Sequence, residues 1–453
     1  MLVRSASATP SAKCLPRRLR HMLSPCQQLL AGLVAACCLT DPSFAGPAFN
    51  LDQLIGIGLN ENAYVLASRE QVAAAKGDAT IARAYPNPDI GGQLGRSKER
   101  NSLTPISGQV YNITMAQPIE IPMVRSARID AADEIVKATD ASRQSFEDDT
   151  VARIKLAYYE LLRRLAEATV TEEDLALTQQ IRDRIALRHQ VGESPKFDLI
   201  RADTEMLNAR KNRDAARLRV EQARANLRLA VGHPLPEGWT VEGTLPNSIQ
   251  LPAKEKLKAE LLARNPVLMK TEAEQRAAEH RLSMEKSMRL PKIALIAERE
   301  VDPTQQYSRG GVVMTIPLWD WRSGQISKAK AEVSSSRHQL NAQRLSFGES
   351  LEATYQLYQI ASNQVRVLET ELLSQAAAAQ RIAESAYRYG ERGILEWLDA
   401  QRTYRAARNE LIAARFDLAT VSVEIDRLRS ISHQPPEKPI AGTANSASQL
   451  PDF

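Results

Sequence analysis

The chain has 453 residues, of which 25% are charged and 5% aromatic, with 59 lysines and arginines against 54 aspartates and glutamates. The mean hydropathy of −0.34 and the lack of an apolar run of about 18 residues beyond the N-terminal region exclude a polytopic helical membrane protein. All four cysteines lie between Cys14 and Cys38, so the rest of the chain holds no cysteine nucleophile, thiolate metal site or disulfide framework.

The N-terminal 45 residues are predicted to be an export signal. Three arginines between residues 17 and 20 precede the uncharged stretch 29–39, and small residues at 43–45 allow cleavage before Gly46. Residues 1–45 contain five bases and one acid, so cleavage lowers the net charge from +5 to +1. The mature chain then has no basic stripe for a nucleic-acid partner.

Two other interpretations of this segment stay open. Residues 34–37 can form a lipobox, which would leave Cys37 anchored by lipid. Alternatively, residues 27–39 form a buried helix in a chain that is not exported.

Beyond the signal, the sequence repeats one plan twice. In each copy a helical segment closes on a proline, an Ile-Pro pair opens a long helix, and a glycine turn leads into a second helix. Matching landmarks lie 195 to 205 residues apart, which indicates a duplication with changes in loop length. The paired landmarks are Asn60–Pro86 with Asn265–Pro291, Ile121-Pro122 with Ile316-Pro317, Val191–Glu193 with Tyr389–Glu391, and Asp198–Ala202 with Glu396–Ala400.

We therefore divide the mature chain into two repeats and a tail. The first repeat, residues 46–250, is expected to hold a helix, a β-hairpin at 89–118 and a long helical hairpin. The second repeat, residues 251–432, is expected to hold the same elements, with its β-hairpin at 292–317. The tail, 433–453, contains two adjacent prolines and is predicted to be disordered.

Alternating apolar and polar residues predict two strands in each repeat. Tyr111, Ile113 and Met115 fall on one side of the stretch 110–117, with Asn112 and Thr114 on the other. Prolines at the borders end each helix or strand and redirect the chain. The predicted strands cover 90–97, 110–117, 292–299 and 311–316, with a connection at 300–310 in the second repeat.

The long helices show the spacing of a coiled-coil seam. A helix from Ser126 to Gln190 would extend about 98 Å, too long for one compact domain. Glycine turns then lead into return helices that end near Val231 and Leu428. In the second repeat the predicted seam runs through positions 351, 355, 358, 361, 365, 368, 372, 375, 379, 382, 386 and 389.

Four strands are too few for one chain to cross a membrane alone. An open sheet edge in lipid leaves backbone groups without hydrogen bonds, and four strands cannot close on themselves. Three copies would supply twelve strands and twelve helical rods, which predicts a homo-oligomer in contact with outer-membrane lipid. The alternative is a sheet outside the membrane in a long coiled-coil protein.

At this point the sequence resembles the TolC-like outer-membrane factors, the outer membrane efflux protein family. The resemblance covers nearly all of residues 50–430, and its most specific part is the stretch Tyr389–Arg402. The Ile-Pro-Leu opening at Ile316 also matches, and the segment Ala82–Pro88 is most similar to the heavy-metal efflux branch typified by CzcC.

The resemblance implies a mainly α fold with a small β part. Three chains would form a 12-stranded outer-membrane β-barrel continued by a periplasmic α-barrel of coiled-coil helices. This homotrimer would be the passive exit duct of a tripartite efflux system in a Gram-negative bacterium. A periplasmic adaptor, or membrane fusion protein, would couple it to an inner-membrane transporter of the resistance-nodulation-division type, and metal cations or drugs would be the cargo.

The resemblance also carries over a gate and a docking tip. Glu396 and Asp399 occupy the positions of the acidic residues that narrow the closed tunnel, and Arg392 stands at the basic position of the restraining network. The first repeat offers Asp198 and Arg201 at the equivalent places. Spacing alone is equally typical of a solvated helix face. The expected adaptor-docking residues are Gly192, Glu193, Gly390, Glu391 and Gly393, which could also be ordinary helix caps.

Enzymatic function has no support in the sequence. The six histidines are isolated, and no phosphate loop or nucleophile elbow is present. We expect no catalytic residues, no resident metal and no cofactor. Two alternative functions stay open: the outer-membrane channel of a type I protein secretion system, and a non-conducting periplasmic coiled-coil scaffold or adaptor.

Overall fold

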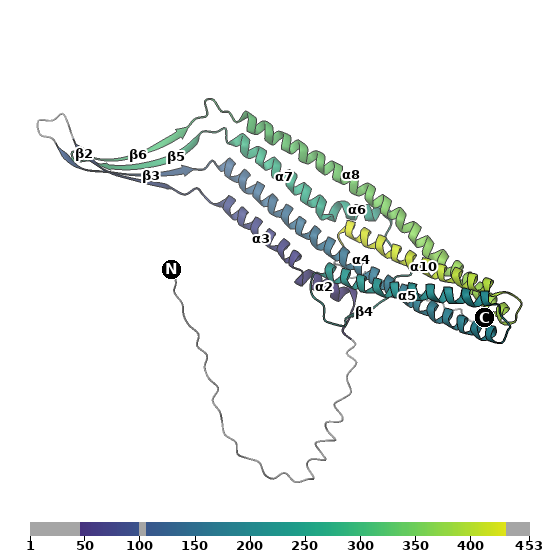
Figure 1. Cartoon of the computed structure of the whole chain (residues 1–453). Helices are drawn as coiled ribbons and strands as arrows, with labels where there is room; N and C mark the ends of the chain where they lie inside the picture. The colour runs from purple at the N-terminus through teal and green to yellow at the C-terminus, as the bar shows by residue number, and fades with distance from the viewer. Residues whose placement is uncertain (1–45, 99–105, 432–453) are drawn as a thin grey trace, which may run out of the picture. The chain divides into compact units, whose positions relative to one another are not determined.

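A computed structural model describes residues 46–98 and 106–431 (Figure 1). The predicted export signal, with Cys37, and the predicted tail at 433–453 lie outside the described residues. The chain divides into two compact units, of which the smaller contributes only residues 46–47 and 236–240 to the described part. All elements discussed below belong to the larger unit, apart from Thr240 at the start of a two-residue strand.

The first repeat forms a helix pair, a β-hairpin and a long helical hairpin. Its predicted long helix is real and begins at Pro122, whose missing N–H costs nothing at the first helical position. The elements are β1 (Ala48–Phe49), α2 (Leu51–Glu61), α3 (Ala63–Arg83), β2 (Asp89–Lys98), β3 (Ser107–Ile119), α4 (Pro122–Gln190), α5 (Lys196–Val231) and β4 (Thr240–Val241).

The second repeat has the same order of helices and hairpin strands. Its described residues hold no counterparts of the two-residue strands β1 and β4, and a π-helical turn divides its long helix. The elements are α6 (Lys254–Arg264), α7 (Pro266–Ser287), β5 (Lys292–Val301), β6 (Gln306–Thr315), α8 (Ser323–Val367), the π-turn η1 (Leu368–Leu372), α9 (Leu373–Arg388) and α10 (Ile394–Arg429). The connection between β5 and β6 is only residues 302–305, shorter than the predicted 300–310.

One asparagine in each repeat shows the duplication at atomic detail. Asn62 ends α2 and begins α3, and Asn265 ends α6 and begins α7. The Asn62 side chain accepts from the N–H of Tyr64 and donates to the carbonyl of Val231 at 3.1 Å. Asn265 does the same with Val267 and with Leu428, at 3.0 Å. The structural equivalent of Asn265 is therefore Asn62 and not Asn60, because a buried cap must sit at the helix break.

The four long strands form one antiparallel sheet in the order β2-β3-β5-β6. Residues paired across neighbouring strands point to the same side. The pairs Ile90 with Met115, Gly92 with Ile113 and Leu295 with Val312 place apolar residues together. We call this side the apolar face; it carries Ile90, Leu94, Tyr111, Ile113, Met115, Ile119, Ile293, Leu295, Ala297, Val312 and Met314.

The other side of the sheet is polar toward the hairpin loops. Asn112, Glu298 and Arg309 share this side, which we call the polar face. Its polar residues near the loops include Gln93, Asn112, Thr114, Glu298, Glu300 and Arg309. Asp89 and Lys292, together with Ile296 and Val313, lie on the same side nearer the helices. The alternation predicted for 110–117 is confirmed and extends over four strands.

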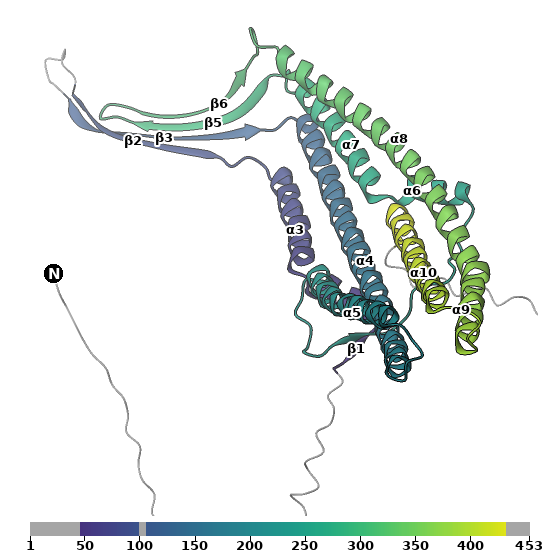
Figure 2. The same cartoon turned by 45° about the vertical axis from the view of Figure 1, so that its right-hand side comes forward.

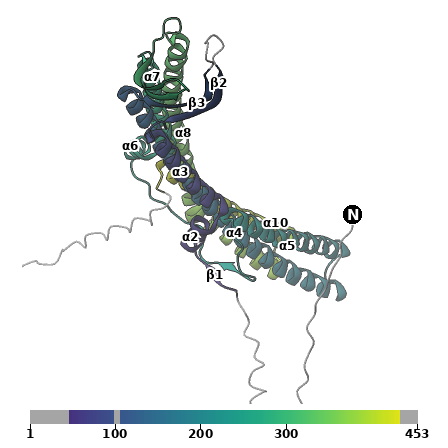
Figure 3. The same ribbon diagram turned by 90° about the vertical axis from the view of Figure 1, so that its left-hand side faces the viewer.

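Helices α3, α4, α7 and α8 follow one another in the same order as the strands they adjoin (Figures 1 and 2). Toward the hairpin ends, α5 and α10 pack against α4 (Figure 3). Within residues 46–98 and 106–431, no helix is both long enough and apolar enough to span a membrane.

The π-turn η1 changes the coiled-coil seam of the second repeat. Up to Leu368 the observed seam agrees with the prediction, since Leu351, Ala361 and Val365 are buried. Beyond the turn, Leu372 and Gln375 are exposed, while Leu373 packs against the core and Ala376 is buried, so the seam has moved one residue along. A π-turn holds one residue more than an α-turn, which is why the predicted positions 372, 375, 379, 382 and 386 do not form the seam.

Candidate functional site at the hairpin ends

Both helical hairpins turn with the same backbone geometry. Gly192 and Gly390 adopt φ of 79° and 76°, in the left-handed region where a side chain is strained. In each turn, the residue after the glycine donates its backbone N–H to the carbonyl five residues earlier and so caps the helix end. Glu193 donates to the Arg188 carbonyl and Glu391 to the Ala386 carbonyl, both at 2.9 Å. Gly393 differs, because its backbone is extended and it serves as the N-cap of α10.

A single apolar cluster, here called the tip cluster, joins the two hairpins near these turns. Trp397 of α10 is 1% exposed and stacks on Tyr387 of α9 at 5.1 Å between ring centroids. The cluster draws on α4, α5 and α10 together, so the ends of the two repeats are packed as one body. Its buried members are Ile181, Ile185, Ala202, Ile394, Trp397 and Leu398.

The two predicted gate acids lie beside the tip cluster. Glu396 and Asp399 are exposed, while Trp397 and Leu398 between them point into the cluster. Spacing of i, i+3 places both carboxylates on neighbouring positions of one helix surface. Burial of the two intervening residues fixes the direction in which this surface faces.

The other predicted gate residues have different surroundings. Asp198 accepts a hydrogen bond of 3.2 Å from the Ser194 hydroxyl, and Arg201 is half-buried. Arg392 has an exposed side chain, and its backbone N–H donates to the Ala386 carbonyl. Within the described part of the chain, none of the five predicted gate residues forms an ion pair, so one chain does not bring the acids and Arg392 together.

Sequence reasoning missed a row of ion pairs between the hairpins. Three arginines of α10 reach acids of the first repeat: Arg402 pairs with Glu205, Arg405 with Asp174, and Arg408 with Glu173. The Asp174 side chain is only 4% exposed, and a buried carboxylate needs such a partner. The signal in the sequence is the three-residue spacing of the arginines opposite the acidic run 172–174, but the pairing depends on helix packing.

A further ion pair joins the two helices of the first hairpin. Arg182 of α4 donates to Asp203 of α5 at 2.9 Å. The hydrogen bonds to Asp203 and to Asp183 raise the pKa of Arg182. Together these contacts hold α4, α5 and α10 in one arrangement above the glycine turns.

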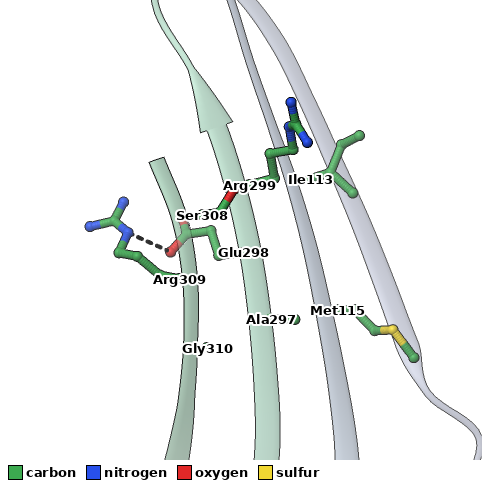
Figure 4. A pocket seen from close by; sticks show the side chains of 8 residues that line it. All are labelled: Ile113, Met115, Ala297, Glu298, Arg299, Ser308, Arg309 and Gly310. Carbon is green, nitrogen blue, oxygen red and sulfur yellow. Dashed lines mark ion pairs between the residues drawn. The ribbon is translucent and has the colours of Figure 1, made fainter. Parts of the chain in front are cut away.

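The polar face of the sheet carries a second set of charged contacts. Asn112 donates to Glu298 at 2.8 Å, and Arg309 pairs with Glu300 at 2.7 Å and with Glu298 at 3.6 Å. Figure 4 shows Arg309 and Glu298 turned toward each other. With Asp89 and Lys292 nearer the helices, each chain thus presents three acids and two bases on this face.

Over the described ranges, no group of three or more histidine, cysteine, aspartate or glutamate side chains is placed to hold a metal ion.

Comparison with known proteins agrees with this arrangement. The profile of the family described as outer membrane efflux protein matches residues 54–233 and 257–429, one segment in each repeat. The chain is 24% identical over 389 residues to the cobalt-zinc-cadmium resistance protein CzcC of Cupriavidus metallidurans, covering 85% of this chain and 90% of that protein. It is also 24% identical over 413 residues to the outer membrane efflux protein BepC of Brucella suis, covering 88% and 89%.

The fold is shared with solved structures. A crystal structure of a membrane protein from Pseudomonas aeruginosa superposes with a TM-score of 0.73 at 18% sequence identity, covering 84% of this chain and 90% of that one.

Proposed function

The chain belongs to the outer membrane efflux protein family and is an outer-membrane efflux channel of a Gram-negative bacterium; from this premise we propose that three copies form a passive exit duct for metal cations. The observation that carries the proposal is the four-stranded sheet with unpaired edges at β2 and β6. Both edge strands have ten residues, so β6 of one copy can pair along the full length of β2 in the next.

Three such junctions close a ring of twelve strands. Closure satisfies the edge backbone groups, which lipid cannot do. The apolar face then meets lipid, and the polar face lines the pore, as in other aqueous barrels. Each copy contributes the acids Asp89, Glu298 and Glu300 and the bases Lys292 and Arg309 to the pore wall. The net charge is −1 per copy, which leaves an excess of three negative charges around the ring.

The excess of acids supports a cationic cargo. A ring of carboxylates concentrates cations and repels anions. CzcC, to which the chain is similar, is named for resistance to cobalt, zinc and cadmium. A duct needs no metal-binding cluster along its wall, because the driving force comes from another component.

The gate is proposed at the tip of the second hairpin. In a trimer, Glu396 and Asp399 would supply six carboxylates where the tunnel narrows, with Arg392 of each copy as the compensating base, and Asp198 and Arg201 would form a weaker ring. Replacing both acids, Glu396→Ala with Asp399→Ala, should raise single-channel conductance in planar bilayers and reduce cation preference. Unchanged conductance would remove the gate from the proposal.

The turns are proposed to contact a periplasmic adaptor that leads to an inner-membrane transporter of the resistance-nodulation-division type. Left-handed glycines keep the turns short and blunt, and Glu193 and Glu391 are exposed beside them. Cysteine cross-linking from these turns should capture the adaptor. Cross-links found only near the sheet would contradict docking at the tips.

The proposed cargo is tested in cells. A strain lacking the gene should become sensitive to zinc, cobalt or cadmium and recover when the wild-type gene is returned. Sensitivity to hydrophobic drugs alone would contradict a metal cargo. A purified protein that stays monomeric without detergent and forms no heat-modifiable trimer would contradict the duct itself.

A further inference from the structure

A hollow lies over the sheet and is lined mostly by residues of the apolar face, with Arg299 as the charged residue on that side; Glu298 and Arg309 of the polar face complete its lining. The hollow has a volume of about 390 Å³ and is lined mainly by residues of β3, β5 and β6 (Figure 4). Six lining residues belong to the same side of the sheet: Ile113, Met115, Ala297, Arg299, Ser308 and Gly310.

Small residues create the hollow. Ala297 lies opposite Gly310 in the β5–β6 pairing, and Ser308 lies two positions earlier on the same side of β6. These three residues leave little side-chain volume over the two strands, because the long Arg299 side chain lies beside Ile113 (Figure 4). Ile113 and Met115 rise beside them from β3, and both are about half exposed, at 51% and 44%. The result is a hollow with an apolar part formed by Ile113, Met115 and Ala297.

Arg299 is one of three bases on this side of the sheet, with Arg96 and Lys98, and of these three it alone is among the residues that line the hollow. Figure 4 shows its side chain beside Ile113, away from the pair formed by Glu298 and Arg309. It is exposed, and in the part of the chain that the structure describes it has no ion-pair partner. Its two neighbours in sequence, Glu298 and Glu300, point to the polar face, where Arg309 neutralises them in part.

The position of Arg299 along the strand decides what it can meet. It lies two residues before the end of β5 at Val301, on the side of the hairpin loops. A cation on the lipid side costs about 2–4 kcal/mol at the bilayer midplane but about 0–1 kcal/mol near the interface. In the proposed duct, Arg299 would lie near the membrane interface, where lipid phosphates are found, and Arg96 shares this side of the sheet nearer the loops.

We propose that this hollow binds one anionic, phosphate-bearing lipid per chain, with an alkyl chain against Ile113, Met115 and Ala297 and a phosphate on the Arg299 guanidinium. The proposal rests on the duct described above, which turns this face toward the membrane. The hollow is centred on β5, an inner strand, so a neighbouring copy joined at β2 and β6 leaves it open to lipid.

The test is lipid retention by the purified full-length trimer. Trimers in detergent are titrated with phosphatidylglycerol, and bound lipids are counted by native mass spectrometry. Wild-type protein should retain about one lipid per chain. Arg299→Gln should weaken binding about tenfold, because a hydrogen bond to a charged group is lost. Ala297→Leu, which fills the hollow, should weaken it similarly.

Two controls separate this site from general charge. Arg96→Gln removes a base from the same side outside the hollow and should change retention less than twofold. Inorganic phosphate at the same concentration should not displace the lipid; equal displacement would mean a free-anion site and would overturn the proposal. A photocrosslinker at Ile113 should capture lipid, and capture of a second copy of the chain would equally overturn it.

Single-channel conductance distinguishes failure of this proposal from failure of the duct. If Arg299→Gln conducts normally and retains as much phosphatidylglycerol as wild type, the lipid site is wrong and the duct stands. If wild-type protein forms neither trimers nor channels, both proposals fail together.

Discussion

The long helices of the two repeats both reach the tip cluster, but their backbones differ. Helix α4 runs without interruption from Pro122 to Gln190, whereas the second repeat is interrupted by the π-turn at Leu368–Leu372. Even so, both helices deliver apolar residues to the tip cluster, with Ile185 from the first and Tyr387 from the second. A duplicated helix can therefore take in one extra residue without turning its distal face away from its partner.

Deletion of one residue from each helix tests this comparison with the largest expected effect. Removing Thr171 from α4 would rotate everything beyond it by about 100° and turn Ile181 and Ile185 out of the tip cluster. Removing Thr370 from η1 should be tolerated, because the π-turn can close to an α-turn while α9 keeps facing α10. Limited proteolysis of the hairpin ends measures the difference, and equal damage by both deletions would contradict it.

The two repeats contribute unequally to the stability of the tip cluster. Trp397→Ala should destabilise the hairpin ends by about 3–5 kcal/mol, the usual cost of removing a buried aromatic residue. Leu199→Ala at the equivalent position of α5 should cost about 1–2 kcal/mol, since Leu199 is only partly buried. Hydrogen exchange of the amides at 381–400 measures both variants. A larger loss of stability for Leu199→Ala than for Trp397→Ala would contradict the dominant contribution of Trp397.

Ion pairs between hairpins should matter more than those within one hairpin. Arg405→Gln leaves the carboxylate of Asp174, 4% exposed, without its partner and should cost about 3 kcal/mol. Arg217→Gln breaks a pair whose side chains are 61% and 53% exposed and should cost less than about 1 kcal/mol. Chemical denaturation of the two variants side by side provides the comparison. Similar costs would mean that burial of Asp174 is not decisive.

The smallest expected effect is a pair of opposite responses to pH. Burial raises the pKa of Asp426 despite Lys155, so the folded state holds this proton more tightly than the unfolded chain and loses stability as pH rises through the titration. Burial alone would raise the pKa of Glu134, but hydrogen bonds from Lys137 and Arg276 lower it below 4.5. Its contribution is present above that value and is lost as pH falls through the folded pKa.

Two variants separate these responses. Asp426→Asn should flatten the loss of stability at rising pH, and Glu134→Gln should flatten the loss at falling pH. Denaturant midpoints measured across the acidic range check both. The same pH profile in both variants and the wild type would contradict the opposite signs.

Much of the fold follows from periodicity in the sequence. The alternation of Tyr111, Ile113 and Met115 with polar neighbours identified a strand and its two faces, and burial of Leu351, Ala361 and Val365 follows the predicted seam. The π-turn has no such signal, because one inserted residue alters neither composition nor local propensity. Only the shift of burial from the predicted position 375 to Ala376 reveals it.

Charged residues in strands were the second source of error. Glu300 and Arg309 made 300–310 resemble a connection, yet both lie in strands and pair on the polar face. A sheet with one face in water can carry ion pairs on that face, whereas a sheet buried on both faces cannot. At the hairpin ends, the turns of Gly192 and Gly390 were found from sequence, but the partners of Arg402, Arg405 and Arg408 follow from the packing of three helices.

The matching hydrogen bonds of Asn62 and Asn265 show that the chain is a duplication, which has a consequence for how such a barrel can evolve. Half of this chain would hold two strands and one helical hairpin, so an unfused ancestor would need six identical subunits for the same circumference. Fusion of two repeats halves the number of subunits to be assembled and lets the sequences of neighbouring repeats diverge. The acid pair Glu396 and Asp399 exists in one half only, because the equivalent positions of the other half hold Asp198 and Arg201. Around the ring, a pair of two acids would therefore alternate with a pair of one acid and one base.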